Sequence, residues 1–350
     1  MNKIDTKTRV QILTMLREGS SMRSVSRVCG VSINTVTKLL VDAGTLCAAF
    51  HDERVRGVKA TKVQCDEIWS FSYAKAKNVR FAKSAPESAG DVWTWTGIDA
   101  NSKLIVSWHV GDRSQYTGVS FTGDLKARLA NRVQLTTDGH KAYLTAVSEV
   151  DLDADYAMLI EIFANDVPPG PGRYSPLRCI GTQTEVIKGA PDPQHINTSF
   201  AERQNLTMRM AMRRFTRLTN AFSKKFENHC HALAIYFYWY NWVRVHKTLG
   251  VTPAMAAGLV GRVMKMDDIL AALDVQQAPK LRGPYKKRGD ETNFKLRHYP
   301  SFNEAWPVPK LNRPVTDKES PYPGLATSRT PGPIFKRQHR RLQRKQSCSG

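Results

Sequence analysis

The sequence predicts an α/β protein in which helices flank a mixed β-sheet. Three observations predict this fold class. Apolar residues recur at helical spacing through the first 45 residues, alternate as in β-strands in segments between residues 63 and 137, and give way after residue 278 to a charged, proline-rich stretch. The predicted parts are an all-α domain at 1–45, a linker at 46–60, an α/β domain at 61–278 and a disordered basic tail at 279–350.

The charge of the chain indicates a polyanionic partner. Its 350 residues include 52 Lys and Arg against 31 Asp and Glu, a formal net charge of +21. This charge favours nucleic acid over a membrane surface. The longest apolar run, residues 232–240, is also shorter than the roughly 20 residues that span a bilayer. We therefore expect no membrane association.

The six cysteines are scattered singly, without a CxxC pair. This pattern excludes a zinc ribbon and argues against a disulfide scaffold. The opening residues, MNKIDTKTR, lack the apolar core of a signal peptide. We expect a cytoplasmic protein associated with the nucleoid.

Three short helices are predicted in the first 45 residues, with a glycine turn between the second and third. Their inward positions are Val10, Leu13 and Leu16, then Met22, Val25 and Val28, then Val36, Leu39 and Leu40. Gly30 ends the second helix, and Ser32 is a good N-cap for the third. This arrangement predicts a helix-turn-helix domain.

The outward face of the third helix suggests DNA binding. It carries Asn34, Thr35 and Lys38, whose side chains can bond base edges and phosphates in a major groove. The alternative is a small helical cap with a polar outer face.

Strand-like alternation begins after Lys62. Strands are predicted at 63–73, 92–98, 104–110 and 133–137, with a helix at 114–129 and further helices after the last strand. Asp66 and Glu67 then point to opposite faces of the first strand, so that only one of them can face a given site. Asp66 lies on the more polar side and is the better candidate. Glu67 and Asp99 are second choices.

A third acid, Glu202, opens a long helix. Glu202, Asn205, Arg209 and Arg213 follow at steps of three and four residues and would share one helix face. The acid could hold a metal ion while the arginines bind phosphates. The alternative is a capping box, Ser199-x-x-Glu202, in which Glu202 only satisfies a backbone amide.

The three acids together suit a two-metal site. Asp66 lies on a strand, Asp138 at a strand end and Glu202 at a helix start. Two Mg²⁺ (or Mn²⁺) ions held by such carboxylates activate the attacking oxygen and stabilise the leaving oxygen in phosphoryl transfer.

At this point the sequence resembles the DDE-type transposases of bacterial insertion sequences, in particular the insertion-sequence-one-like family. The resemblance covers about residues 7–275. The matching stretches are QCDEIWSF, WTWTGIDA, TTDGHKAYL, SFAERQNLTMRMAMRRFTRLTNAFSKK and YNWVRVHKTLGVTPAMAAGL.

The resemblance implies an RNase H-like catalytic domain. Asp66, Asp138 and Glu202 match the residues that bind two divalent ions in that family, and Arg209 matches its basic residue two helical turns after the Glu. Some relatives carry an N-terminal zinc finger, for which this chain lacks the cysteines. Recognition of DNA ends would then depend on the helix-turn-helix.

The predicted function is a transposase that binds the terminal inverted repeats of its element and catalyses metal-dependent strand cleavage and strand transfer. Its partners would be double-stranded DNA, at the element ends and the target, and further copies of the chain. The alternatives are a structure-specific RNase H-like nuclease, a helix-turn-helix regulator and an inactive transposase derivative.

Three other features favour ordinary structural roles. His140 is expected to be a loop histidine without a role in the chemistry, although it could position a water or phosphate. Residues 229–231, His-Cys-His, diverge around a helix and are not expected to bind zinc. The aromatic run 236–240 predicts a buried core helix.

The tail contains 17 Lys and Arg against 5 Asp and Glu. These charges either add phosphate contacts or belong to a solvated appendage.

Overall fold

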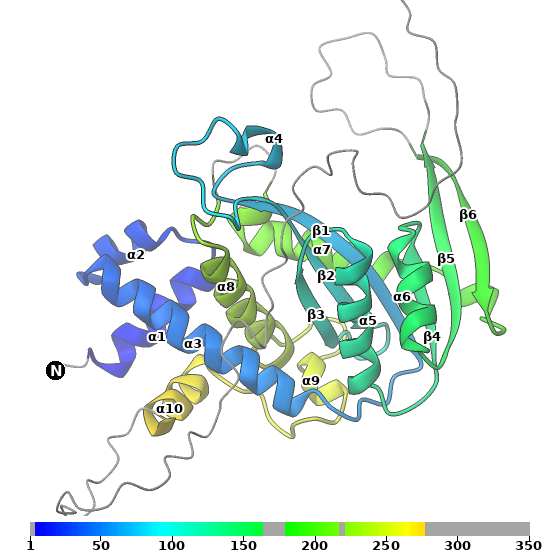
Figure 1. The fold of residues 1–350 in the computed structure, drawn as a ribbon. Helices are drawn as coiled ribbons and strands as arrows, with labels where there is room; N and C mark the ends of the chain where they lie inside the picture. The colour runs from blue at the N-terminus through cyan, green and yellow to red at the C-terminus, as the bar shows by residue number, and fades with distance from the viewer. Residues whose placement is uncertain (1–3, 164–178, 217–220, 277–350) are drawn as a thin grey trace, which may run out of the picture. The chain divides into compact units, whose positions relative to one another are not determined.

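The computed structural model describes residues 4–163, 179–216 and 221–276 (Figure 1). The α-helices are α1 (Thr6–Arg17), α2 (Met22–Cys29), α3 (Ile33–Arg54), α4 (Ala76–Val79), α5 (Gln115–Arg128), α6 (Ala142–Val150), α7 (Ser199–Ala211), α8 (Phe226–Tyr238), α9 (Pro253–Ala256) and α10 (Met266–Gln276). The strands are β1 (Lys62–Ser72), β2 (Gly90–Asp99), β3 (Ile105–Gly111), β4 (Val133–Asp138), β5 (Ala154–Phe163) and β6 (Cys179–Lys188). Two short 3₁₀-helices are η1 (Pro193–His195) and η2 (Arg213–Phe215), and η3 (Trp239–Val243) is a short π-helix.

The strands form one mixed six-stranded sheet in the order β3-β2-β1-β4-β5-β6. β1, β2 and β3 pair antiparallel, β4 lies parallel to β1 and to β5, and β6 returns antiparallel to β5. The α/β prediction is confirmed, and the sheet is compatible with an RNase H-like fold. The expectation of only helices after β4 is wrong, because β5 and β6 extend the sheet there.

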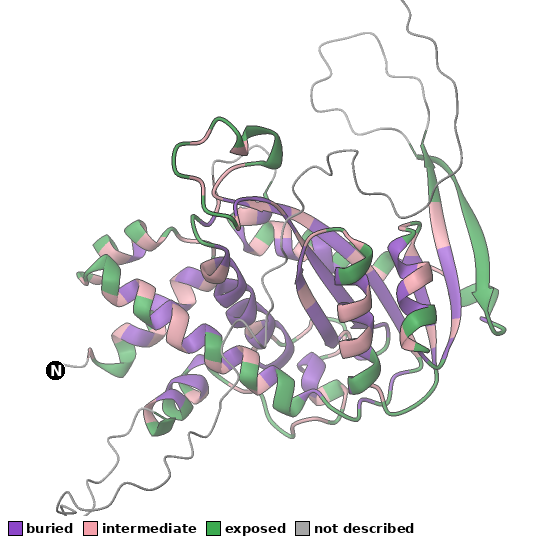
Figure 2. Cartoon of the chain, viewed as in Figure 1, coloured by how far each residue is buried: buried purple, intermediate pink, exposed green. Residues whose placement is uncertain are grey.

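Helices cover both faces of the sheet. Trp95 of β2 is buried against Phe121 of α5 and Tyr143 of α6, with ring centroids 5.9 and 5.2 Å away. On the other face, Trp108 of β3 packs against Phe237 of α8, with ring centroids 4.9 Å apart. Figure 2 shows buried residues concentrated in these central strands and in α8. Apolar burial of this kind contributes most of the favourable folding free energy.

Helix α8 confirms the interpretation of the aromatic run as core. Tyr236, Phe237 and Tyr238 are all buried. His229 and His231, which flank Cys230, are buried too, and the cluster of possible metal ligands that the described part of the chain contains lies elsewhere, on β1 and β4.

The first three helices begin with side-chain caps, of which Ser32 is the predicted one. Asp5, Ser21 and Ser32 each accept a hydrogen bond from a backbone amide in the first turn of α1, α2 and α3. Gly30 ends α2 in the left-handed conformation, at φ 63°, which costs glycine little. The three helices therefore follow the predicted order, and their binding to DNA stays a prediction.

Helix α3 differs from the prediction in length. It continues to Arg54, so residues 46–54 are helical where a linker is expected at 46–60. By length and composition α3 could cross a membrane, but it packs against α8, α2 and α10. Tertiary contacts support the extended part. The rings of Phe50 and Tyr238 of α8 lie 5.5 Å apart, and His51 Nε2 lies 3.2 Å from the carbonyl oxygen of Val106 in β3. The divisions at residues 45, 60 and 278 stay predictions, and the tail from 279 lies outside the described residues.

Gly44 permits the close contact between α3 and α8. A Cβ atom at this position would lie 2.5 Å from Cβ and 2.7 Å from Cα of His231. We expect Gly44→Ala to destabilise the protein by about 2 kcal/mol, because the overpacking penalty exceeds the gain of up to about 1 kcal/mol in helix propensity. Urea unfolding measures the difference.

Gly123 provides the matched control on another helix. A Cβ there would meet only Val150 Cγ2 of α6, at 4.0 Å. Gly123→Ala should therefore keep or slightly raise the free energy of unfolding. Equal effects of the two substitutions would contradict the packing argument for Gly44.

Candidate active site

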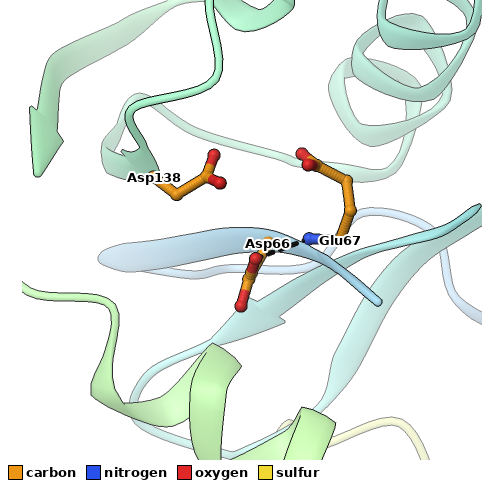
Figure 3. Close-up of side chains that lie close together, drawn as sticks. All are labelled: Asp66, Glu67 and Asp138. Atoms are coloured by element: carbon orange, nitrogen blue, oxygen red, sulfur yellow. Dashed lines mark hydrogen bonds between the residues drawn. The ribbon is translucent and has the colours of Figure 1, made fainter. Parts of the chain in front are cut away.

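Three carboxylates meet where β1 and β4 lie side by side (Figure 3). Asp66 and Glu67 lie on β1, and Asp138 is the last residue of β4. The parallel register pairs Cys65 with Thr137, which brings the next residues of both strands to the same level of the sheet. One oxygen of each acid lies within 4.8 Å of the others. The sequence prediction that Asp66 and Asp138 converge agrees with this geometry.

Glu67 joins the cluster although strand alternation separates it from Asp66. Figure 3 shows the carboxylates of Glu67 and Asp138 on one side of β1, with the Asp66 side chain on the other. The backbone amide of Glu67 donates to Asp66 Oδ1 at 2.7 Å, and this bond keeps that oxygen close to the strand. The two side chains lie on opposite sides of β1, as expected. One oxygen of each still lies within 4.8 Å of the other, so the expectation that only one of the two acids can face a site is wrong.

Burial disfavours negative charge on all three acids. It raises the pKa of Asp66 to about 7 and that of Glu67 to about 8, and it raises the pKa of Asp138 above its ordinary value. The charge of Asp138 adds to the shifts of the other two acids. A bound proton or cation would stabilise such a cluster, because it offsets the buried negative charge.

Arg113 supplies one positive charge to the cluster. Its Nε lies 3.1 Å from Glu67 Oε2, and its Nη2 lies 3.5 Å from Asp138 Oδ2. The guanidinium also lies 4.6 Å from the centroid of the Trp93 ring. Sequence reasoning missed Arg113 because a single arginine in the turn after β3 has no spacing signal.

One buried oxygen of the site lacks a good hydrogen bond. Glu67 Oε1 and the Tyr143 hydroxyl are both buried without a hydrogen bond of normal geometry, although the hydroxyl lowers the pKa of Glu67. A buried carboxylate oxygen without a well-formed hydrogen bond is stabilised by a proton or by a cation beside it. The donor set is also all carboxylate, which suits Mg²⁺ or Mn²⁺.

Helix α7 closes the second side of the site. Its Asn205 is buried and donates from Nδ2 to Asp66 Oδ2 at 2.7 Å. Glu202 is exposed one turn earlier, and its charge raises the pKa of Asp66. The sequence expects both residues on this face, and both line the same cleft as Asp66 and Asp138.

The capping-box alternative for Glu202 does not hold. The carboxylate of Glu202 accepts a hydrogen bond from the hydroxyl of Thr198, and the hydroxyl of Ser199 donates to Asn197 Oδ1. Thr198, not Ser199, precedes the first helical residue. Glu202 Oε2 thus stays available to a ligand in the cleft.

Helix α7 ends before Arg213, which therefore does not lie on the helix face predicted for it. α7 stops at Ala211, and Arg213 begins the turn η2 with an exposed side chain. Arg209 lines the cleft, whereas Arg213 does not. Placing Arg213 on the same helix face as Glu202 is therefore wrong.

The cleft has a volume of about 1050 Å³. Carboxylates of Asp66, Glu67, Asp138 and Glu202 lie along it together with the cationic side chains of Lys141, Arg203 and Arg209. His140 also lines it, and its backbone amide donates to Asp138 Oδ1 at 3.2 Å. Acids that hold a metal and cations that hold phosphates are the two elements that metal-assisted phosphoryl transfer requires.

The predicted DNA-reading residues lie at the start of α3. Asn34 and Lys38 are exposed, and Lys38 forms an ion pair with Asp42. Thr35 is half-buried and its hydroxyl contacts that of Ser32 at 2.9 Å. Asn34 and Lys38 can therefore reach a ligand, while Thr35 is partly used in the helix cap.

Glu67 gives the site a measurable pH dependence. Burial raises the pKa of Glu67 from 4.5 to about 8. Between these two pH values Glu67 is protonated in the folded protein and ionised in the unfolded chain. The free energy of unfolding attributable to Glu67 therefore decreases as the pH rises through this range, by up to about 1.4 kcal/mol per unit.

We expect Glu67→Gln to remove this decrease, since glutamine has no proton to release. Urea unfolding in EDTA from about pH 5 to about pH 7.5 measures the slope for each protein. Glu87→Gln, at an exposed loop position, serves as the control and should follow the wild type. A Glu67→Gln slope equal to that of the wild type would contradict the burial argument.

No protein-family model matches this chain, and no curated protein matches it. Among solved structures, the chain is similar to a cryo-EM structure of a piggyBac transposase synaptic complex with hairpin DNA. The similarity covers 82% of this chain and 77% of that chain, with 8% sequence identity and a TM-score of 0.32. Similarity at this level carries no argument about function, which has to be inferred from the residues of the site.

Proposed function

We propose that this protein is a DNA transposase that cleaves and joins DNA strands with the help of divalent metal ions. One observation carries the proposal. Asp66 and Asp138, which are 72 positions apart in the chain, lie with oxygens within 4.8 Å in a cleft that Glu202 also lines. Together with the resemblance of the surrounding motifs to insertion-sequence transposases, this geometry favours a site for Mg²⁺ or Mn²⁺, with two ions expected.

The residues have distinct parts in this chemistry. Asp66, Asp138 and Glu202 would hold the ions, and Asn205 would fix the orientation of Asp66 through its hydrogen bond. Arg209 would contact phosphates beside the reacting one. The bound ions would supply activation of the attacking oxygen and stabilisation of the leaving oxygen.

Two in-line displacements would follow one another in the same cleft. In the first, a water oxygen bonds to phosphorus and the bond to the 3′ oxygen breaks, which frees a 3′-hydroxyl at the element end. In the second, that hydroxyl attacks a phosphodiester of the target, and the target's own 3′ oxygen leaves. Each displacement replaces one P–O bond with another, so no covalent bond between protein and DNA is required.

Recognition of the element ends would fall to the N-terminal helices. Asn34, Thr35 and Lys38 would contact the terminal inverted repeats in the major groove. Joining two ends to one target requires at least two copies of the chain on DNA. Such a complex would form on chromosomal DNA in the cytoplasm.

The test combines purified protein with duplex DNA that carries the repeats flanking its gene. We expect cleavage and joining in Mg²⁺ or Mn²⁺ and neither reaction in EDTA. Cleavage of branched DNA regardless of end sequence, without joining, would identify a structure-specific nuclease instead. Tight binding without metal-dependent cleavage would identify a regulator or an inactive derivative.

A further inference from the structure

The connection between β1 and β2, residues 73–89, presents an unusual combination of side chains, and we refer to it as the β1–β2 loop. It follows the end of β1 and contains α4 (Figure 1). Four cationic side chains in it are exposed, Lys75, Lys77, Arg80 and Lys83, against the single acid Glu87. Figure 2 shows most of this segment as exposed. The loop therefore carries a net positive charge of +3 toward solvent.

Phe81 adds an apolar group to this cationic surface. Its side chain is 73% exposed, one of the largest values for a bulky apolar residue in the described part of the chain. The guanidinium of Arg80 lies 4.5 Å from the ring centroid and covers one side of the ring. An exposed aromatic ring among cations is the combination with which proteins bind unpaired bases and the phosphates next to them.

Hydrogen bonds hold the loop in place without a ligand. The hydroxyl of Tyr73 donates to the carbonyl of Lys83 at 2.6 Å, and the amide of Ala76 donates to Asp91 Oδ1 at 2.9 Å. The amide of Tyr73 donates to the carbonyl of Ser223 at 2.9 Å. Because these bonds order the backbone in advance, binding would cost less conformational entropy.

The loop lies at a useful distance from the candidate active site. Asp66 and Ser72 are six residues apart on β1, which corresponds to about 20 Å along an extended strand. That length matches about six base pairs of duplex DNA. A strand bound in the cleft could therefore continue to the loop.

We propose that the β1–β2 loop binds the DNA strand next to the cleavage position, with Lys77 and Arg80 on phosphates and Phe81 stacked on an unpaired base. This inference rests on the proposed function, since it concerns the DNA held by the same site. It assigns to the loop a preference for DNA whose pairing is interrupted about half a helical turn from the cut.

The test measures DNA binding by fluorescence anisotropy in EDTA, so that no cleavage takes place. One probe is a blunt duplex with an element end, and the other is the same duplex with unpaired bases at the loop position. We expect Phe81→Ala to weaken binding of the second probe about tenfold, which is the usual size of a base–aromatic contact. Its binding of the blunt duplex should stay unchanged.

Charge reversal tests the phosphate contacts. Lys77→Glu/Arg80→Glu should weaken binding of both probes. It should also reduce the magnitude of the slope of the logarithm of the association constant against the logarithm of the salt concentration by about 1.8, because two phosphate contacts are lost. Lys126→Glu/Lys188→Glu is the matched control, with the same change of charge at exposed positions on α5 and β6. Its slope should change less.

The outcomes separate this inference from the proposed function. A Phe81→Ala protein that still favours the unpaired probe, or a Lys77→Glu/Arg80→Glu slope equal to that of the control, would overturn the inference while DNA binding and cleavage remain. Wild-type protein that binds neither probe but binds vesicles of acidic lipid would overturn both.

Discussion

Asp138→Asn is expected to abolish metal-dependent cleavage and strand transfer, with a loss of at least about 10³-fold. Asparagine keeps the shape of the side chain and removes the charge that would hold a divalent ion beside Asp66. Loss of a metal ligand removes stabilisation of both the attacking and the leaving oxygen, and about 4 kcal/mol of lost transition-state stabilisation corresponds to this factor. Single-turnover cleavage of end-containing DNA measures it.

Two controls make this result specific. Asp153→Asn replaces an exposed acid whose contact is an ion pair with Arg132, and it should cleave at close to the wild-type rate. Asp138→Asn itself should bind the end-containing DNA normally, because the predicted end-binding residues lie on α3. An Asp138→Asn protein that cleaves and joins DNA like Asp153→Asn would overturn the assignment of the site.

Glu202→Gln and Glu67→Gln should differ strongly in their effect on cleavage. We expect a loss of about 10²-fold or more for Glu202→Gln, because Glu202 is exposed to the cleft and free to contribute a ligand oxygen. For Glu67→Gln we expect a loss below about tenfold. The pKa of Glu67 is raised to about 8, so glutamine resembles the protonated form that already predominates near pH 7.

The comparison decides which glutamate completes the site. Cleavage rates at equal Mg²⁺ concentration measure both variants, and circular dichroism confirms that each is folded. A large loss for Glu67→Gln with little loss for Glu202→Gln would place the ions among Asp66, Glu67 and Asp138, whose oxygens lie within 4.8 Å of one another.

Local signals in the sequence predict the parts of the fold that depend on local chemistry. Ser32 marks a helix start because its hydroxyl accepts an amide hydrogen bond there. Regular alternation predicts β1, β2 and β3. The convergence of Asp66 and Asp138 follows from two parallel strands at the centre of a mixed sheet, which the order of strands and helices already suggests.

Tertiary contacts decide the features that sequence reasoning missed. Residues 154–163 read ADYAMLIEIF, a stretch rich in helix-forming residues that becomes strand β5 because it pairs with β4 and β6. β6 has no buried face to give it an apolar pattern. Arg113 joins the site through a turn, and Glu67 reaches the site because a backbone amide fixes one oxygen of Asp66 near it. None of these contacts produces a periodic pattern of residues in the sequence.

Anomalous diffraction from crystals soaked in Mn²⁺ tests the central claim most directly. The account predicts a strong peak bonded to oxygens of both Asp66 and Asp138, with a second peak next to Glu202 when DNA is bound, and no peak at this position in Asp138→Asn crystals. Well-ordered wild-type crystals that show manganese elsewhere, or none between these two aspartates at millimolar Mn²⁺, would contradict it.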